Sequence, residues 1–263
     1  MVFKKLKANS LRLSFGIRSY LRNRISKPNR DAIFIFGLQK SGTSAIARLL
    51  AEKTGKSVTI DTKYLWQPHY ARLISGKIKI KNHVNKYSYP FSKEIIKEPN
   101  STFLIHQIKD FFYLNRYVFI VRNPLDNIRS ILNRLNIPGD LENIDLERVN
   151  DNWKHLFLSS NGKDYINVLA NLWVKANGQT EIINSKNCIL VRYEDFIKDK
   201  ENFIEKLVFK VGLESVNNIS EFVDLQYQPK GNSNVNLKTF YGNKNYDKII
   251  QKCNPIMRLF NYN

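Results

Sequence analysis

The segment DAIFIFGLQKSGTSAIARLL, residues 31–50, constrains the fold more than any other part of the chain. It begins with a short apolar run, residues 32–36, which predicts a buried β-strand. A loop bounded by Gly37 and Gly42 follows, and small and apolar residues from Thr43 onward predict a helix. A strand, a glycine-rich turn and a helix N-terminus form a cradle for an anion, because backbone N–H groups and the positive helix end point toward it. The segment therefore predicts a phosphate site.

The position of the lysine in this loop narrows the ligand. Gly37 and Gly42 have the G-x-x-x-x-G spacing of a Walker A loop, but Thr43 stands where the lysine of that motif would follow. The lysine lies inside the loop, at Lys40. This indicates a phosphate ligand other than an ordinary nucleoside triphosphate bound with magnesium.

A second segment predicts another phosphate contact. The run YVFIV, residues 117–121, reads as a buried strand, and it is followed by Arg122 and by a helix that carries Ser130. In an NTPase, a later apolar strand ends in an acidic residue that helps to hold magnesium. An arginine and a serine suit a phosphate monoester instead. The chain thus offers two phosphate sites and no His/Cys cluster with metal-ligand spacing.

The rest of the chain alternates short apolar strands with longer helices. Strands are expected near residues 32–37, 57–60, 102–107, 117–121 and 188–191, and helices near 43–54, 63–74, 125–135, 145–158, 164–184 and 199–211. This alternation predicts an α/β fold, a parallel β-sheet flanked by helices on both faces. The basic segment from 77 to 100 is interrupted by two prolines and is expected to run over the surface.

These motifs resemble the sulfotransferases that use 3′-phosphoadenosine 5′-phosphosulfate, PAPS. QKSGTS resembles their 5′-phosphosulfate loop, and FIVRNPLDNIRS resembles their 3′-phosphate motif, with Arg122 and Ser130 on its arginine and serine. CILVRYEDF resembles a strand whose tyrosine, here Tyr193, lies near the adenine. The resemblance covers roughly residues 31–263. It implies a P-loop-like sulfotransferase fold that needs no metal, closer to the carbohydrate and bacterial members.

The resemblance also implies which residues bind the donor. Lys40 and the loop N–H groups would stabilise the charge that develops on the leaving phosphate oxygen. Lys230 and Gly231 resemble a late segment that closes over the 3′-phosphate in part of the family, although Pro229 stands where its arginine would be. The expected donor-binding residues are Gln39, Lys40, Ser41, Gly42, Thr43, Ser44, Arg122, Ser130, Tyr193, Lys230 and Gly231.

The general base is less well defined by the sequence. Asp61 directly follows an apolar run and fits the carboxylate base of the carbohydrate members, or it caps the helix that follows. His106 and Lys109 are expected on the third strand. There His106 is an alternative base and Lys109 a contact to the transferring sulfate. The catalytic candidates are thus Lys40, Asp61, Lys109 and His106.

Composition and charge limit the possible domain organisation and location of the protein. The formal net charge is +19, and residues 1–30 hold nine basic and no acidic residues. Leu13, Ile17 and Leu21 have near-helical spacing, so this segment is expected either to lie on an anionic membrane or to pack on a catalytic domain over 31–263. No apolar run is long enough for a membrane span, and two cysteines make no disulfide framework, so a cytoplasmic location, at the inner membrane face or free of it, fits best.

The expected reaction is sulfuryl transfer to an acceptor hydroxyl on a carbohydrate or glycolipid. Three alternatives remain open: a small alcohol or phenol as acceptor, a P-loop kinase, and a non-catalytic anion- or membrane-binding protein. Nucleic acid is not an expected partner, because the basic residues form no recognisable RNA- or DNA-binding module.

Overall fold

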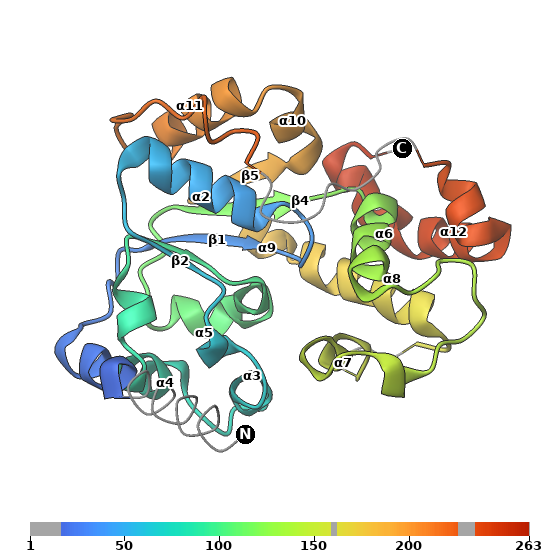
Figure 1. Cartoon of the computed structure of the whole chain (residues 1–263), viewed down its shortest axis with the longest axis horizontal. Coiled ribbons are helices and arrows are strands. Elements are labelled where there is room, and N and C mark those ends of the chain that lie inside the picture. The colour runs from blue at the N-terminus through green and yellow to red at the C-terminus, as the bar shows by residue number, and fades with distance from the viewer. Residues whose placement is uncertain (1–16, 159–161, 226–234, 263) are drawn as a thin grey trace, which may run out of the picture.

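A five-stranded parallel sheet forms the centre of the molecule. The computed structural model describes residues 17–158, 162–225 and 235–262. The strands are β1 (Ile33–Gly37), β2 (Val58–Ile60), β3 (Ile95–Lys97), β4 (Tyr117–Val121) and β5 (Cys188–Arg192). Their order is β2-β3-β1-β4-β5, and every neighbouring pair is parallel (Figure 1). The predicted α/β class is therefore confirmed.

Both faces of the sheet are covered by helices, because successive side chains of a strand point to opposite faces. Ile33 and Ile35 of β1 belong to one core, and Phe34 and Phe36 belong to the other. Figure 1 shows α2 and α11 on one side of the sheet and α5 on the other. The first layer contains α2 (Thr43–Thr54), α10 (Tyr193–Lys198) and α11 (Lys200–Lys210).

The second layer is larger and holds most of the aromatic core. Its helices are α5 (Ile105–Lys109), α6 (Pro124–Leu135), α8 (Tyr165–Asn177), α9 (Thr180–Ile183) and α12 (Leu237–Met257). Trp173 of α8 is fully buried here. Helix α12 bends at Gly242, whose φ of 64° is outside the helical range. It packs mainly on α8, so the C-terminal part of the chain closes this side of the core.

Shorter elements complete the described chain. They are α3 (His69–Ile74), α4 (Ile80–Lys86), α7 (Asp151–Leu158), a helix over residues 17–25, and 3-10 turns over Lys63–Leu65, Tyr89–Ser92, Pro99–Leu104, Leu146–Arg148 and Arg258–Phe260. None of the helices in the described ranges is long and apolar enough to cross a membrane.

The third strand is not where the sequence predicts it. Residues 102–107 are expected to be a strand, but they form the end of a 3-10 turn and the start of α5. Their buried residues, Leu104, Ile105 and Ile108, have the spacing of one helix face, which a short apolar run does not distinguish from a strand. The strand is Ile95–Lys97, whose three buried residues are too few to give a period-2 pattern.

Other boundaries also differ. The expected surface segment from 77 to 100 contains β3, so its last part is core rather than surface. The helix expected at 63–74 is divided into a 3-10 turn and α3, which begins just after Pro68. The helix expected at 164–184 ends at Asn177, before Gly178, and α9 follows. Proline and glycine cause these breaks because neither supports a helix interior.

Candidate functional site

Five chain segments meet at the edge of the sheet where the strands end. Since all strands are parallel, the loop after β1, Asp61 after β2, Lys97 at the end of β3, Arg122 after β4 and Tyr193 after β5 lie on the same edge. This carboxyl edge is the usual ligand site of open parallel sheets. The structure thus brings most of the predicted donor residues to one place.

The loop after β1 adopts a conformation that needs glycine at its two ends. Gly37 has φ 146°, and a Cβ added to it would lie 2.7 Å from the backbone oxygen of Ile120. Gly42 has φ 85°, and its Cβ would lie 2.3 Å from the ring of Tyr193. Gly42 is also the N-cap of α2 and has no side chain, so the first N–H groups of the helix have no side-chain cap. These N–H groups are the anion-binding groups of such a loop.

Side chains that follow the neighbouring strands β3 and β4 hold the loop in place. An Nη atom of Arg122 donates to the carbonyl of Lys40 at 2.8 Å. The amide of Asn127, on α6, donates to the carbonyl of Gln39 and to the hydroxyl of Ser41, both at 2.9 Å. The Gln39 amide donates to Oδ1 of Asn100 at 3.0 Å. The loop is therefore preorganised rather than shaped by a ligand alone.

Lys40 lies in the left-handed region, with φ 68°, inside this loop. Burial lowers the pKa of Lys40, and the nearby positive charges of Arg134, Arg122 and Lys97 add to this effect, so that together they bring it to about 8. Several cations thus gather around Lys40. An anion bound there would relieve their mutual repulsion.

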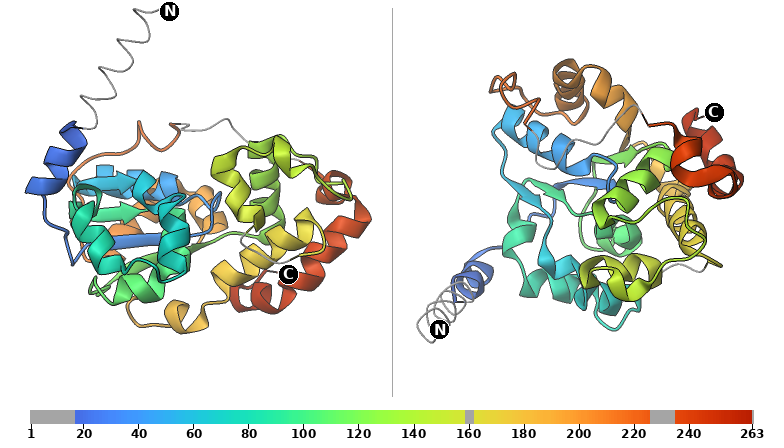
Figure 2. Two further views of the ribbon diagram at one scale, coloured as in Figure 1. Left: turned by 90° about the horizontal axis from the view of Figure 1, so that it is seen from below. Right: turned by 45° about the vertical axis from the view of Figure 1, so that its right-hand side comes forward.

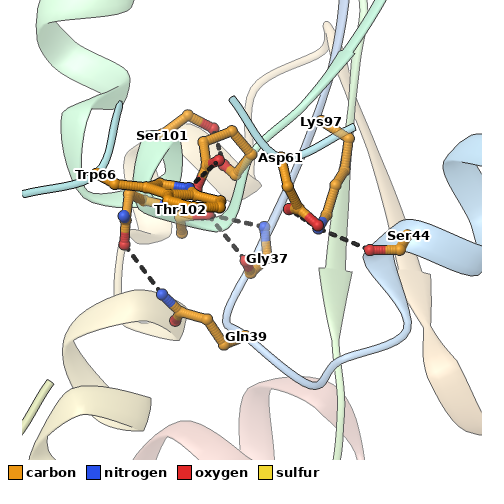
Figure 3. A network of polar contacts seen from close by, with 10 residues as sticks. Gly37, Gln39, Ser44, Asp61, Trp66, Lys97, Ser101 and Thr102 are labelled. Carbon is orange, nitrogen blue, oxygen red and sulfur yellow. Dashed lines mark hydrogen bonds and ion pairs between the residues drawn. The ribbon is translucent and has the colours of Figure 1, made fainter. Parts of the chain in front are cut away.

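Lys97 connects the loop to the predicted base. It is in the central part of the sheet, and its side chain is only 3% exposed. Its Nζ atom donates to Oγ of Ser44 at 2.8 Å and forms an ion pair with Oδ1 of Asp61 at 2.5 Å. Figure 3 shows Lys97 reaching between these two residues. Asp61 has φ 56° and a side chain that is 42% exposed, so its carboxylate is fixed by Lys97 but remains open to an acceptor.

Glu98 supports the same region from inside the protein. One carboxylate oxygen accepts the Nε1–H of Trp66 at 2.9 Å, and the other accepts the backbone N–H of Asn100 at 3.2 Å. The pKa of Glu98 is raised to about 7, mainly by burial and in addition by the charge of Asp61, whereas Lys97 opposes the rise. Trp66 stays partly exposed while its indole N–H is held by Glu98.

The second phosphate motif is built as a strand end and a helix. Arg122 follows β4, and its guanidinium carbon lies 4.5 Å from the centroid of the Tyr193 ring. Trp173 donates to the carbonyl of Arg122 at 2.9 Å and fixes this turn. Asp126, a carboxylate near Arg122 in the sequence, forms an ion pair with Arg129 at 3.0 Å. Ser130 lies half-buried on α6.

The RYED segment is tied to the end of the described chain. One carboxylate oxygen of Glu194 accepts the backbone N–H of Asn123 at 2.9 Å, and the other accepts the hydroxyl of Tyr262 at 2.6 Å. The Arg192 guanidinium carbon lies 4.6 Å from the centroid of the Tyr262 ring. Residue 262 therefore helps to fix the turn that carries Arg122.

Other predicted residues are not brought to this site. Lys109 is exposed and lies 3.9 Å from Glu181. It is also near Phe111, whose carbonyl accepts from Arg30 before β1, so it belongs to the opposite edge of the sheet. His106 is exposed on α5, and the expectation that both residues lie on a strand is wrong. Lys230 and Gly231 lie outside the described residues.

The sequence reasoning missed Lys97, Glu98, Asn100 and Asn127. A lysine after two isoleucines, followed by Glu98 and Pro99, marks the end of a short buried strand, and this pattern was the available signal. Asn127 has no sequence signal of its own, because an asparagine in an amphipathic helix is ordinary.

Aromatic residues near Asp61 mostly pack on each other. Tyr64 and Tyr87 are stacked with ring centroids 4.1 Å apart, and His83 bonds the carbonyl of Tyr64. Phe91 is in the core. Within the described ranges no group of three or more His, Cys, Asp or Glu side chains is arranged to hold a metal ion.

Comparison with known proteins identifies the family. Residues 57–217, well over half of the chain, match the family model described as "Sulfotransferase family". No curated protein matches the sequence.

Solved sulfotransferases share the fold. Mouse sulfotransferase SULT7A1, solved in complex with PAP, has a TM-score of 0.53 and 16% identity, over 89% of this chain and 87% of that one. A sulfotransferase from Alicyclobacillus acidocaldarius has a TM-score of 0.51 and 12% identity, over 91% and 98%. The sulfotransferase domain from the curacin biosynthetic pathway has a TM-score of 0.51 and 13% identity, over 90% and 99%.

Proposed function

The chain belongs to the sulfotransferase family, and from this premise we propose that it transfers a sulfuryl group from PAPS to a hydroxyl of a carbohydrate or glycolipid. The observation that carries the proposal is the contact of Lys97 with both Ser44 and Asp61, since it joins an anion-binding loop to a solvent-open carboxylate. Residues 31–263 would form the catalytic domain.

The proposed donor site has two parts, and its residues fit the charges of PAPS. Lys40 and the N–H groups from Ser41 to Ser44 would bind the 5′-phosphosulfate, which supplies the sulfuryl group, and Thr43 and Ser44 would add hydroxyl donors. Arg122 and Ser130 would bind the 3′-phosphate, and the Tyr193 ring would lie against the adenine. Gly42 lets that ring approach the loop. Gln39, Lys230 and Gly231 complete the proposed donor set.

The charge arrangement suits an in-line transfer. Negative charge grows on the leaving phosphate oxygen, and preorganised cations and N–H groups stabilise it. Lys40 would supply most of this stabilisation, because it is partly buried and lies near other positive charges, as its lowered pKa indicates. The residues described need no metal ion for this role, so we propose a metal-independent enzyme.

Asp61 is the proposed general base. Its half-exposed carboxylate would accept the proton of the acceptor hydroxyl, and Lys97 would hold it in the orientation for attack. Asp61 is favoured over His106 because the Asp61 carboxylate is tied to the donor loop through Lys97, whereas His106 lies on α5.

A sugar fits the acceptor side better than a phenol. The partly exposed Trp66 offers an amphipathic ring of the kind that contacts polar ligands, whereas Tyr64 and Tyr87 are stacked on each other. Residues 62–93 hold seven basic and no acidic residues, which suits an anionic glycan or a membrane-bound acceptor. We further propose a cytoplasmic enzyme in peripheral contact with the inner membrane face.

A labelled-sulfate transfer screen tests the function. Glycans, glycolipids and phenols are offered as acceptors to the wild type, to Asp61→Asn, and to Asp31→Asn as a matched control at an exposed carboxylate near the other edge. Transfer to a glycan or glycolipid that is lost only in Asp61→Asn supports the proposal. Transfer to phenols alone, with Asp61→Asn fully active, would overturn both the acceptor class and the base.

A further inference from the structure

The helix over residues 17–25 is docked by its polar side. The hydroxyls of Ser19 and Tyr64 are 2.8 Å apart. Asn23 accepts the backbone N–H of Tyr89 with its side chain at 3.0 Å and the hydroxyl of Ser88 with its carbonyl. Ser19 and Asn23 are one turn apart, so this face of the helix is turned toward the body of the protein.

The opposite face of this helix is apolar and exposed. It consists of Ile17, Tyr20, Leu21 and Ile25, whose exposed fractions are 54%, 60%, 54% and 81%. At about 100° per residue these four positions cover an arc of roughly 140°, and its centre lies opposite Ser19 and Asn23. A helix that packs on a core does the reverse, with its apolar stripe inward. Figure 2 shows the helix at the margin of the molecule.

We call these four residues the outward face. Positive charges lie around them. Arg18 and Arg22 are exposed beside the arc, and Arg24 is exposed within it, between Tyr20 and Ile17. The Arg24 guanidinium carbon lies 5.8 Å from the Tyr20 ring centroid, and that of Arg22 lies 5.1 Å from the ring centroid of Tyr89 on the docked segment. The segment on which the helix docks, residues 62–93, has no acidic residue. The whole region is therefore both apolar and strongly cationic.

We propose that the outward face binds the surface of an anionic lipid bilayer. Its four apolar side chains would enter the boundary between headgroups and acyl chains, and Arg18 and Arg24 would contact lipid phosphates. Basic amphipathic helices bind membranes by this combination of buried apolar area and charge.

Other occupants fit less well. A second copy of this chain would bring another net charge of +19 to a surface that is already cationic. A nucleic acid would satisfy the arginines but would leave Leu21 and Ile25 in water. Only a lipid surface offers an apolar layer behind a layer of phosphates.

The docking also links the membrane to the reaction. Tyr64, which bonds Ser19, is three residues beyond Asp61, so the helix contacts the chain segment that carries the proposed base. The inference specifies the membrane contact of the proposed function and rests on that function for its biological purpose. Binding to vesicles is measured without donor or acceptor, so a failure of the membrane proposal can be distinguished from a failure of the proposed function.

Vesicle sedimentation of the full chain tests the proposal. We expect binding to vesicles that contain phosphatidylglycerol and little binding to phosphatidylcholine alone. Leu21→Gln with Ile25→Gln should weaken binding about tenfold or more, because two buried aliphatic side chains are lost. The matched control is Ile197→Gln with Phe209→Gln, which removes two exposed apolar residues from α10 and α11 and should bind as wild type does.

A second pair of variants separates the charge from the apolar contact. Arg18→Gln with Arg24→Gln should also weaken binding, whereas Lys206→Gln with Lys210→Gln on α11 should not. The Leu21/Ile25 variant and the Arg18/Arg24 variant should both keep the melting temperature of the wild type and its rate of transfer to a water-soluble acceptor.

Several results would overturn the proposal. One is equal vesicle binding by the Leu21/Ile25 variant and the wild type, which would leave only electrostatic adsorption. A lower melting temperature for that variant would mean that the face is covered within the chain, and a change of oligomeric state would mean a second copy. Binding to an oligonucleotide that outcompetes the vesicles would identify a nucleic-acid surface. In contrast, vesicle binding by a chain that transfers no sulfate would contradict the proposed reaction and would still support the membrane-binding surface.

Discussion

Lys97 and Asp61 form an ion pair in which one partner is almost wholly buried and the other is open to solvent. Their atoms Nζ and Oδ1 are 2.5 Å apart, and the same Nζ atom reaches Ser44 at the start of α2. Burying a lysine at the end of a strand costs free energy, and its contacts with Asp61 and Ser44 offset part of that cost. Lys97 would thus position Asp61, the proposed base, against the proposed donor loop.

The first prediction concerns Lys97→Met. Methionine fills a similar volume without the charge, so folding stability should change little or rise, whereas turnover should fall by about a hundredfold or more. Lys53→Met is the matched control, because it breaks the Lys53–Glu205 ion pair of 2.7 Å away from the carboxyl edge. Urea unfolding and kcat measure the two effects. If Lys97→Met and Lys53→Met lost the same stability and the same activity, Lys97 would have only a structural role.

The second prediction separates the two cations of the donor site. Lys40→Ala should mainly lower kcat, because the charge it stabilises is largest in the transition state. Arg122→Ala should mainly weaken the binding of PAP, by about 2–4 kcal/mol if its phosphate contact is desolvated. Arg116→Ala, which loses an exposed contact to the carbonyl of Gly212, is the control. Calorimetry with PAP and steady-state kinetics distinguish the roles, and wild-type values for both variants would refute the site.

The third prediction uses two glycines with similar backbone angles. Gly42 and Gly76 have φ of 85° and 71°, but only at Gly42 would a Cβ meet another group, the Tyr193 ring at 2.3 Å. Gly76→Ala should cost only the backbone strain, about 1–2 kcal/mol. Gly42→Ala should cost more and should also weaken PAP binding, because the ring and the loop must move apart. Similar behaviour of the two variants in melting and PAP titrations would contradict the close approach.

The fourth prediction is a dependence of stability on pH. The pKa of Glu98 is raised from 4.5 to about 7, so the folded state binds a proton more tightly than the unfolded state between these values, and stability should fall as pH rises through that window. The pKa of Lys40 is lowered from 10.5 to about 8, so stability should rise again from pH 8 to 10.5. Burial also lowers the pKa of His83 to about 4, which makes stability rise with pH over much of the same window. The Glu98 contribution is therefore read as the difference between the urea unfolding curves of the wild type and Glu98→Gln, which should shrink as pH rises from 4.5 to 7. A difference that does not change with pH would contradict the raised pKa of Glu98.

The fifth prediction concerns metals. Lys40, Arg122 and the loop N–H groups are expected to neutralise the donor without a cation. Sulfate transfer should therefore continue in EDTA at the rate seen without it. Complete loss that magnesium restores would point to a kinase-like site.

The sequence was sufficient for the parts of the fold in which local pattern and position agree. The apolar runs before Gly37 and Arg122 each gave a strand and a helix at their observed places. Parallel pairing then brings the two phosphate motifs together without further information, because strand ends of a parallel sheet share one edge.

The acceptor side was less predictable because it depends on a three-residue strand. Ile95–Lys97 is too short for a periodic signal, and the longer apolar run after it drew the assignment of a strand to α5. That shift moved the expected lysine from Lys97 to Lys109, which lies near the opposite edge of the sheet. The contacts of Asn127 and Asn100 with the loop join residues more than 60 positions apart, and no local pattern encodes them.

The bridge from Asn123 through Glu194 to Tyr262 has a consequence for synthesis. The loop after β1 leaves the ribosome early, whereas the hydroxyl that completes this bridge is added more than two hundred residues later. A nascent chain would therefore carry the loop and the Arg122 turn long before the last of these contacts forms. Full order at the proposed 3′-phosphate turn is expected only after residue 262 has emerged, when synthesis of the described chain is almost complete.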